Sequence, residues 1–211
     1  GIAMVTGGPG HANAVGALYT ALCAESPMVL LSGHAATHEL GRGGFQEIRQ
    51  ADMAAPVSKA SWTARSADTL GAEIAEALRI ATSGRPGPVH VSLPSDMLDQ
   101  RLPDNAIRWP SATDSAGPPR GLPKPIADAV LAEIAAAKRP LVLAGPNFAH
   151  GDGRSLLAAL EGACGAPAVL MESVRGLNDA TLGGFAQTLM RADLIVLLAK
   201  PLDFTLKFGE A

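Results

Sequence analysis

The residues best suited to chemistry stand in a glycine-rich turn near the start of the chain. Residues 6–13 read TGGPGHAN, after a short apolar run and before a helical pattern. Glycines permit backbone conformations and close approaches that a side chain would prevent, and Pro9 fixes φ and donates no hydrogen bond. Such a turn can hold a ligand against bare backbone where a parallel strand ends, although a tight turn that binds nothing fits the same spacing.

The turn matches neither of two common phosphate-binding motifs. Counted from Gly8 and Gly10, the dinucleotide fingerprint G-x-G-x-x-G would need a third glycine at the position of Asn13. No lysine of a P-loop follows the glycines. A ligand at this turn would therefore be bound in another way.

A second candidate is the polar, glycine-rich loop of residues 34–47, which is long for a plain connection. Its His38 carries an imidazole that could transfer protons near neutral pH, and a surface histidine without a catalytic role is the alternative. His34 and His38 are four residues apart. The glycines on either side and the lack of a nearby cysteine argue against a helical metal-binding pair.

The elements that must position these residues follow a strand–helix–strand rhythm. Short apolar runs at residues 1–6, 28–33 and 88–93 predict strands, and apolar residues at helical spacing predict helices at residues 12–25 and near 70–81. Ser66 or Asp68 could cap the second helix. The rhythm predicts an α/β fold with parallel strands and helices on both faces of the sheet.

The chain changes character where prolines become frequent, from about residue 101 to residue 125. We interpret this stretch as an extended linker without regular elements. A second alternation of helices and strands follows, ending in a strand at residues 194–198. The predicted organisation is two doubly wound, mostly parallel-sheet domains, at residues 1–100 and 123–211, joined by a linker at residues 101–122.

Composition excludes several classes of function. The 211 residues carry a net charge of −3 and only 4% aromatic residues, which argues against nucleic acid as a partner. No apolar run approaches the roughly 20 residues of a membrane helix, and no basic-then-apolar leader opens the chain, so we expect neither membrane nor secretion. Cys23 and Cys164 lie in helical patterns typical of buried free thiols, which predicts a reducing, cytoplasmic compartment.

Three motifs together resemble the thiamine-diphosphate-dependent enzymes of the acetolactate synthase group. They are TGGPGHAN at residues 6–13, GFQE at residues 44–47 and ATSGRPGPVHVSLP at residues 81–94. The second half resembles the central domain of that group, most clearly in ADLIVLL at residues 192–198. The resemblance covers nearly the whole chain.

This resemblance implies a pyrimidine-binding domain, a Rossmann-like central domain and a pyrophosphate-binding domain. The chain is similar to the later part of the first domain and to an incomplete second domain. The glutamate that protonates the aminopyrimidine would lie before residue 1, and the domain that binds diphosphate through Mg²⁺ would lie after residue 211. We therefore expect the chain alone to be inactive.

The resemblance also implies roles for individual residues. The implied cofactor-binding residues are Thr6, Gly8, Pro9, Gly10, Asn13 and Phe45. Thr6, Pro9 and Asn13 would face the pyrimidine end of the cofactor, while Phe45 and Gln46 would reach the substrate side of a site completed by a second subunit. Gln46 and His38 are the implied catalytic residues. In the same order, the structural alternatives for Thr6, Pro9, Asn13, Phe45 and Gln46 are a hydroxyl that closes the turn, a rigid turn, an amide at the helix start, a packed ring and a solvated amide.

The implied reaction is the cleavage or formation of a C–C bond of a 2-oxo acid through the ylid of thiamine diphosphate, in a homodimer or homotetramer. Within the superfamily, a 2-hydroxyacyl-CoA lyase can share Phe-Gln at positions 45 and 46, whereas oxalyl-CoA decarboxylases have Tyr-Glu there. Sulfoacetaldehyde-type acetyltransferases are a further alternative within the superfamily. A module that binds a nucleotide or CoA without catalysis is the alternative from a different class.

FAD is not expected, because residues 171–184 lack the methionine-histidine-glycine segment of flavin-binding acetolactate synthases. A second segment resembles the metal and diphosphate motif of the family without matching it: Gly-Asp-Gly at residues 151–153, with Asn178 downstream. Position 179 is aspartate instead of asparagine, and the segment lies inside the central-domain pattern. Asp152 is therefore interpreted as the start of a helix, and no metal site is predicted in this chain.

Overall fold

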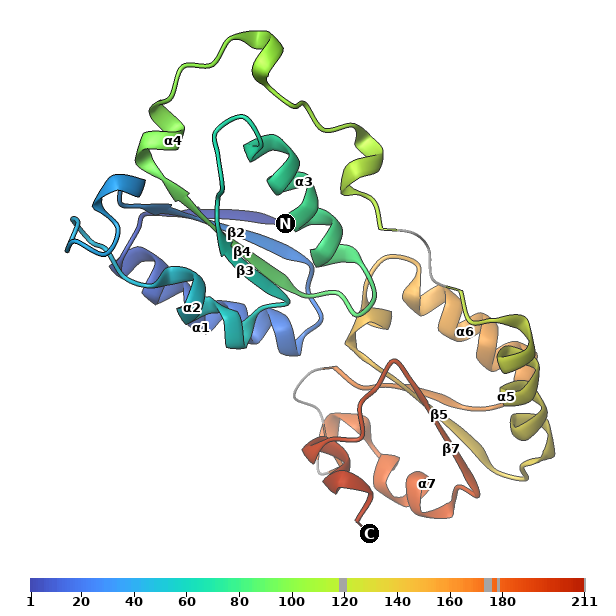
Figure 1. The fold of residues 1–211 in the computed structure, drawn as a ribbon. Coiled ribbons are helices and arrows are strands. Elements are labelled where there is room, and N and C mark those ends of the chain that lie inside the picture. Colours follow the sequence, from blue (N-terminus) through green and yellow to red (C-terminus); the bar gives the residue numbers. More distant parts are fainter. Residues whose placement is uncertain (118–120, 173–175, 178, 211) are drawn as a thin grey trace. The chain divides into compact units, whose positions relative to one another are not determined.

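The computed structural model describes residues 1–117, 121–172, 176–177 and 179–210. The chain divides into two compact units, Gly1–Pro119 and Arg120–Ala211 (Figure 1). Each unit is an α/β structure built on a parallel sheet, so the predicted fold class is confirmed. The finer linker boundaries stay a prediction.

The first unit is organised around a four-stranded parallel sheet in the order β1-β2-β4-β3. Its strands are β1 (Ile2–Val5), β2 (Met28–His34), β3 (Ala60–Thr63) and β4 (Pro88–Pro94). Its helices are α1 (Pro9–Cys23), α2 (Gln50–Ala54), α3 (Leu70–Thr82) and α4 (Ser95–Asp99), with short 3-10 turns η1 (Thr37–Glu39) and η2 (Ala55–Val57). Because all strands are parallel, their carboxyl ends share one edge of the sheet, where ligands of open α/β sheets bind.

Helices cover both faces of this sheet, with α1 and α2 on one face and α3 on the other (Figure 1). Side chains alternate between faces along each strand. Val29, Val89 and Val91 pack with Ala77 of α3. On the opposite face, Leu30 packs with Leu18 of α1 and Ala54 of α2.

The start of α3 is fixed by an acidic side chain in its first turn. The Glu73 carboxylate accepts hydrogen bonds from Trp62 Nε1 at 2.8 Å, from the Arg65 N–H at 3.0 Å and from the Thr69 hydroxyl at 2.9 Å. The N-cap residue is Thr69, and its side chain makes no capping bond. The expectation that Ser66 or Asp68 caps this helix is therefore wrong. Instead, the carboxylate of Glu73, in the first turn of the helix, binds groups of the residues before the helix.

The proline-rich stretch contains two short elements that the sequence did not predict. They are the 3-10 turns η3 (Asp104–Ala106) and η4 (Ala112–Ser115). A capping box forms η4, in which the Ser111 N–H donates to the Asp114 carboxylate at 2.8 Å. Prolines exclude a longer helix here but tolerate a single turn whose amides are bound by a side chain.

The second unit is a three-stranded parallel sheet in the order β6-β5-β7. Its strands are β5 (Pro140–Ala144), β6 (Ala168–Leu170) and β7 (Leu194–Leu198), and its helices are α5 (Lys124–Ala136), α6 (Gly153–Cys164) and α7 (Phe185–Arg191). The described part of this unit also contains the 3-10 segments η5 (Pro146–Ala149), η6 (Ala180–Leu182) and η7 (Phe204–Gly209), the last of which is kinked at residues 206–208. Ile134 of α5 and Leu157 of α6 pack on one face of the sheet, and Phe185 of α7 packs on the other.

Two further expectations can be compared with the structure. Cys23 and Cys164 are free thiols, but both are half-buried, so the expectation of full burial is wrong. Each is the last residue of its helix, and Cys164 packs against the edge of a core cluster. None of the helices within the described ranges combines the length and apolar character that a membrane span requires.

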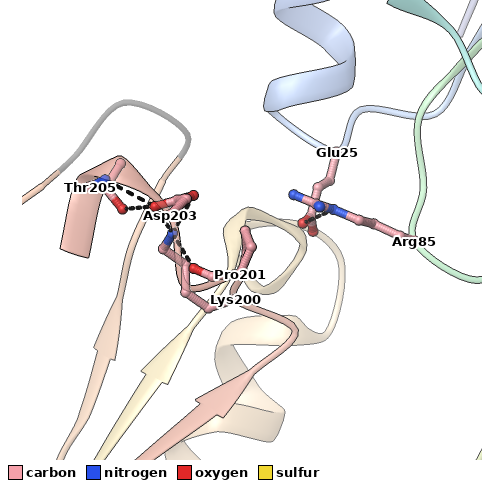
Figure 2. Close-up of polar contacts among 6 residues, drawn as sticks. All are labelled: Glu25, Arg85, Lys200, Pro201, Asp203 and Thr205. Carbon is pink, nitrogen blue, oxygen red and sulfur yellow. Dashed lines mark hydrogen bonds and ion pairs between the residues drawn. The ribbon is translucent and has the colours of Figure 1, made fainter. Parts of the chain in front are cut away.

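A nearly buried ion pair fixes the chain after β7. Lys200 Nζ donates to the two Asp203 carboxylate oxygens at 2.9 and 2.8 Å and to the Pro201 carbonyl at 3.0 Å (Figure 2). Asp203 also accepts from the Thr205 N–H at 3.0 Å and from its hydroxyl. Burial alone would raise the pKa of Asp203, but these bonds outweigh it and hold that pKa below its usual range.

Removing either partner is expected to destabilise the second unit, Asp203→Asn more than Lys200→Met. In Asp203→Asn, the ammonium of Lys200, whose side chain is 4% exposed, would be left without its counter-charge. In Lys200→Met, the carboxylate of Asp203, whose side chain is 30% exposed, would keep its bonds from Thr205. We expect Asp203→Asn to lower the free energy of unfolding by about 3 kcal/mol, measured by urea denaturation. The control is Asp128→Asn, which breaks the exposed Lys124–Asp128 pair and should cost about 0.5 kcal/mol or less. Equal costs for Asp203→Asn and Asp128→Asn would contradict this role of the ion pair.

Candidate functional site

The glycine-rich turn joins the carboxyl end of β1 to α1. Gly8 is the N-cap residue of α1, with φ 55° and ψ −113°, a conformation that favours glycine. A Cβ atom at Gly7 would lie 2.6 Å from the Gly33 carbonyl oxygen, and one at Gly8 would lie 2.6 Å from the Gln46 carbonyl oxygen. Glycine is therefore required here so that the turn can pack against β2 and against the loop of residues 34–47.

A buried glutamine holds the turn in place. The Gln50 side chain is fully buried, and its Oε1 accepts a hydrogen bond from the Gly8 N–H at 2.8 Å. Its Nε2 donates to the Gly33 carbonyl at 3.1 Å and to Ser92 Oγ at 2.9 Å. One amide thus links the start of α1, the end of β2 and strand β4.

Two buried histidines lie on the same face of the sheet as Gln50. The rings of His11 and His90 have centroids 4.5 Å apart at an interplanar angle of 52°. His11 Nδ1 is 2.9 Å from Ser32 Oγ, and His90 Nδ1 is 2.8 Å from Ser61 Oγ. The layer between the sheet and helices α1 and α2 is therefore partly polar.

Both histidines are held neutral. Burial lowers the pKa of His90 to about 3, and the nearby His11 and His34 add to the shift. Burial also lowers the pKa of His11; the backbone of Gln50 opposes this shift and His34 adds to it. Neutral rings leave the polar layer without charge near the glycine-rich turn.

The loop of residues 34–47 closes around its own glutamate. The Glu47 carboxylate accepts hydrogen bonds from the N–H groups of Gly41, Gly43 and Gly44, the last two at 3.1 and 3.0 Å. The bond from Gly41 contributes most to lowering the pKa of Glu47, followed by the bond from Gly44. The closed loop presents Phe45, which is 84% exposed, and Gln46, whose φ is 57°.

The structure places the predicted site residues in two groups. Six are exposed, namely Thr6, Pro9, Asn13, His38, Phe45 and Gln46, while Gly8 is buried and Gly10 is half-buried. The close packing of Gly8 against the Gln46 backbone brings the turn and the loop tip together. His38 lies on η1, where its neighbour Thr37 donates its N–H to Asp96 at the start of α4 at 2.9 Å.

Sequence reasoning missed Gln50, His90 and Ser92, and gave Glu47 no role. One signal was available, since His90 and Ser92 are polar residues two apart in a strand buried along its whole length. That spacing places both on one face of the sheet and indicates a buried polar network there. No comparable signal marks Gln50, because its partners come from three other segments.

The described ranges contain no group of three or more His, Cys, Asp or Glu residues that could hold a metal ion. The binding of Mg²⁺ through another domain stays a prediction. Residues 173–175 and 178 lie outside the described residues. They belong to the segments from which the absence of flavin and of the metal motif was predicted.

The comparisons with known proteins confirm the resemblance. Residues 1–53 match the family described as thiamine pyrophosphate enzyme, N-terminal TPP binding domain. Acetolactate synthase large subunit IlvG of Mycobacterium tuberculosis is 31% identical over 215 residues, covering 99% of this chain and 39% of that protein. Acetolactate synthase isozyme 3 large subunit of Escherichia coli is 36% identical over 149 residues, covering 69% of this chain and 25% of that protein.

An oxalyl-CoA decarboxylase of Escherichia coli is also similar, 28% identical over 221 residues, which cover 100% of this chain and 39% of that protein. The chain is thus similar over its whole length to thiamine-diphosphate-dependent enzymes of the acetolactate synthase-like group. The match of residues 1–53 supports thiamine diphosphate as the cofactor. The chain spans about two fifths (39%) of the length of IlvG and of the decarboxylase.

The glycine requirement can be tested with two alanine substitutions in one segment. Gly8→Ala should lower the free energy of unfolding of the first unit by about 2–4 kcal/mol, because the Cβ would meet Gln46 in a backbone conformation unfavourable for alanine. Gly16→Ala, in the middle of α1 with open space around its Cβ, should stabilise the unit by up to about 1 kcal/mol. Urea denaturation measures both; similar effects of the two substitutions would contradict the close packing of the turn.

The neutral state of His90 predicts a pH dependence of stability. Its pKa is about 3 in the folded chain, against 6.5 for an unperturbed histidine, so between these values the unfolded chain binds a proton that the folded chain does not. His90 therefore makes the free energy of unfolding fall as pH drops below 6.5, by about 1.4 kcal/mol per pH unit. Denaturation of the wild type and of His90→Gln at pH 7, 6 and 5 measures this effect. The two should converge as pH falls, and a constant difference would refute the assignment.

Proposed function

We propose that the protein containing this chain is a thiamine-diphosphate-dependent enzyme that cleaves or forms a C–C bond of a 2-oxo acid. The observation that carries the proposal is the contact between Gly8 and Gln46. It joins the turn expected to meet the cofactor to the loop expected to meet the substrate. The similarity to two acetolactate synthases supports the same reaction class.

The exposed groups around the turn fit the pyrimidine end of the cofactor. Thr6 offers a hydroxyl, Pro9 an apolar ring and Asn13 an amide with both donors and an acceptor. Pro9 and Asn13 are one helical turn apart in α1, so their side chains share a face. A planar heterocycle with ring nitrogens and an amino group needs this mixture of apolar surface and hydrogen-bonding groups.

The remaining residues of this chain position the reactants. When bound, thiamine diphosphate supplies the electron sink that the C–C bond chemistry requires. Gln46 would orient the polar end of the substrate through its exposed amide, and Phe45 would cover the substrate with an apolar ring. His38 is exposed on η1 and is proposed for proton transfer.

A second candidate substrate is an acyl-CoA. The observation that favours it is the match of the whole chain to oxalyl-CoA decarboxylase, an enzyme whose name states a CoA thioester substrate. Phe45 and Gln46 stand where such decarboxylases are expected to have Tyr-Glu, which favours a 2-oxo acid or a 2-hydroxyacyl-CoA over oxalyl-CoA. Assays with pyruvate and with oxalyl-CoA distinguish these substrates.

We also propose that a second copy of the chain completes the site, in a homodimer or homotetramer. The exposed Phe45 ring supports this proposal because large exposed apolar side chains mark contact surfaces. Mg²⁺ would be bound by a domain outside this chain, and FAD would not be required.

Two substitutions should separate cofactor binding from catalysis. Asn13→Ala should raise the Kd for thiamine diphosphate about tenfold, the loss expected for about one hydrogen bond. Gln46→Ala should lower kcat/KM for the 2-oxo acid about tenfold and leave the cofactor Kd unchanged. Calorimetric titration and a steady-state assay of the protein that contains this chain measure these effects.

The matched control is Asn105→Ala, which removes an exposed amide on η3 and should change neither quantity. A protein that does not bind thiamine diphosphate, or an Asn13→Ala variant that binds it like the wild type, would contradict the proposed role of the turn. Unchanged kcat/KM in Gln46→Ala would contradict the proposed role of the loop tip.

A further inference from the structure

A chain of hydrogen bonds runs through the buried layer beneath the glycine-rich turn, and each of its directions can be assigned. The Ser61 hydroxyl donates to the Ala51 carbonyl at 2.8 Å. A hydroxyl has one hydrogen, and a carbonyl can only accept. The contact of 2.8 Å between Ser61 Oγ and His90 Nδ1 must then be a bond donated by the ring.

The tautomer of His90 follows from that bond. A neutral imidazole carries its hydrogen on one nitrogen only, so a ring that donates from Nδ1 accepts at Nε2. Ser92 Oγ lies 3.4 Å from His90 Nε2, a long hydrogen bond in which the hydroxyl is the donor. The lone pairs of Ser92 Oγ are then free to accept from Gln50 Nε2 at 2.9 Å.

The Gln50 amide is oriented by a donor, the Gly8 N–H, and by an acceptor, the Gly33 carbonyl, and the direction at Ser92 decides whether its third bond forms. With Nε2 directed at Ser92 and at the Gly33 carbonyl, Oε1 faces the Gly8 N–H. If His90 instead carried its hydrogen on Nε2, Ser92 would accept from the ring and point its own hydrogen at Gln50. The Ser92 hydroxyl would then place its hydrogen against the Gln50 NH₂ group, so the amide would lose its bond to β4 and be held by Gly8 and Gly33 alone.

We propose that His90 is a positioning residue, whose Nδ1–H tautomer lets Ser92 accept from Gln50 and so anchors to β4 the amide that holds the turn facing the cofactor. The cofactor part of this proposal rests on the function proposed above. The ring is fully buried, and His11 of α1 and His34 of β2 are the ionisable groups near it. Ser61 on β3 and Ser92 on β4 complete its surroundings with neutral hydroxyls.

The first test is spectroscopic and needs no variant. Long-range ¹H–¹⁵N correlation spectra of protein labelled in its histidine rings report which nitrogen of His90 carries the hydrogen. We expect Nδ1–H and an unprotonated Nε2 between pH 7 and pH 5. An Nε2–H tautomer or a protonated ring in this range would overturn the proposal.

The second test follows the effect to the turn. Ser92→Ala removes the link between His90 and Gln50, and we expect hydrogen exchange of the Gly8 amide to become about tenfold faster relative to the Val91 amide in β4. The matched control is Ser32→Ala, which removes a buried hydroxyl bound to His11 on the same face and should leave that ratio unchanged. Equal acceleration in the two variants, or none in Ser92→Ala, would overturn the proposal.

The third test separates this inference from the proposed function. Ser92→Ala should raise the Kd for thiamine diphosphate about threefold to tenfold, while Ser32→Ala should not change it. An unchanged Kd in Ser92→Ala would overturn the positioning role even if the wild type binds the cofactor. Failure of the wild type to bind thiamine diphosphate would overturn the proposed function, and the cofactor part of this inference with it.

Discussion

The first unit depends on one close approach, in which the turn before α1 packs directly against the end of β2 and against residue 46 of the following loop. Only glycine allows this approach at positions 7 and 8, because a Cβ at either position would lie 2.6 Å from a carbonyl oxygen. The amide of Gln50 then holds the turn and the end of β2 together. The placement of the candidate site follows from these contacts, since the turn carries Pro9 and Asn13 while the loop carries Phe45 and Gln46.

Two kinds of electrostatic arrangement surround this contact. Beneath the turn, neutral histidines and hydroxyls form a polar layer without charge, and burial holds the pKa of His90 near 3. In the loop, the charge of Glu47 is retained and is bound by backbone N–H groups, of which Gly41 and Gly44 lower its pKa most. Uncharged hydrogen bonds thus position the buried side of the site, while a bound carboxylate shapes its exposed side. The exposed tip is left with side chains that can meet a ligand.

Much of this arrangement could be predicted from the sequence, and the rest could not for physical reasons. Strands and helices follow from apolar periodicity, and β7 lies at the predicted residues 194–198. The motifs at residues 6–13 and 44–47 indicated which two segments form the candidate site. Gln50 was not predicted, because a polar residue in a short helix is ordinary until its partners from other segments are known. The 3-10 turn η4 was missed because the prolines on either side of it suggested an extended chain, whereas the Ser111–Asp114 capping box stabilises a single turn.

Our central claim is that the glycine-rich turn and the loop tip face the two ends of a single site. The most direct measurement is a structure of the protein that contains this chain with thiamine diphosphate and Mg²⁺ bound. We predict that the aminopyrimidine ring lies against Thr6, Pro9 and Asn13, with the Gln46 side chain directed toward the space for the substrate. A cofactor bound away from this turn, or a Gln46 side chain directed away from the cofactor, would contradict the claim.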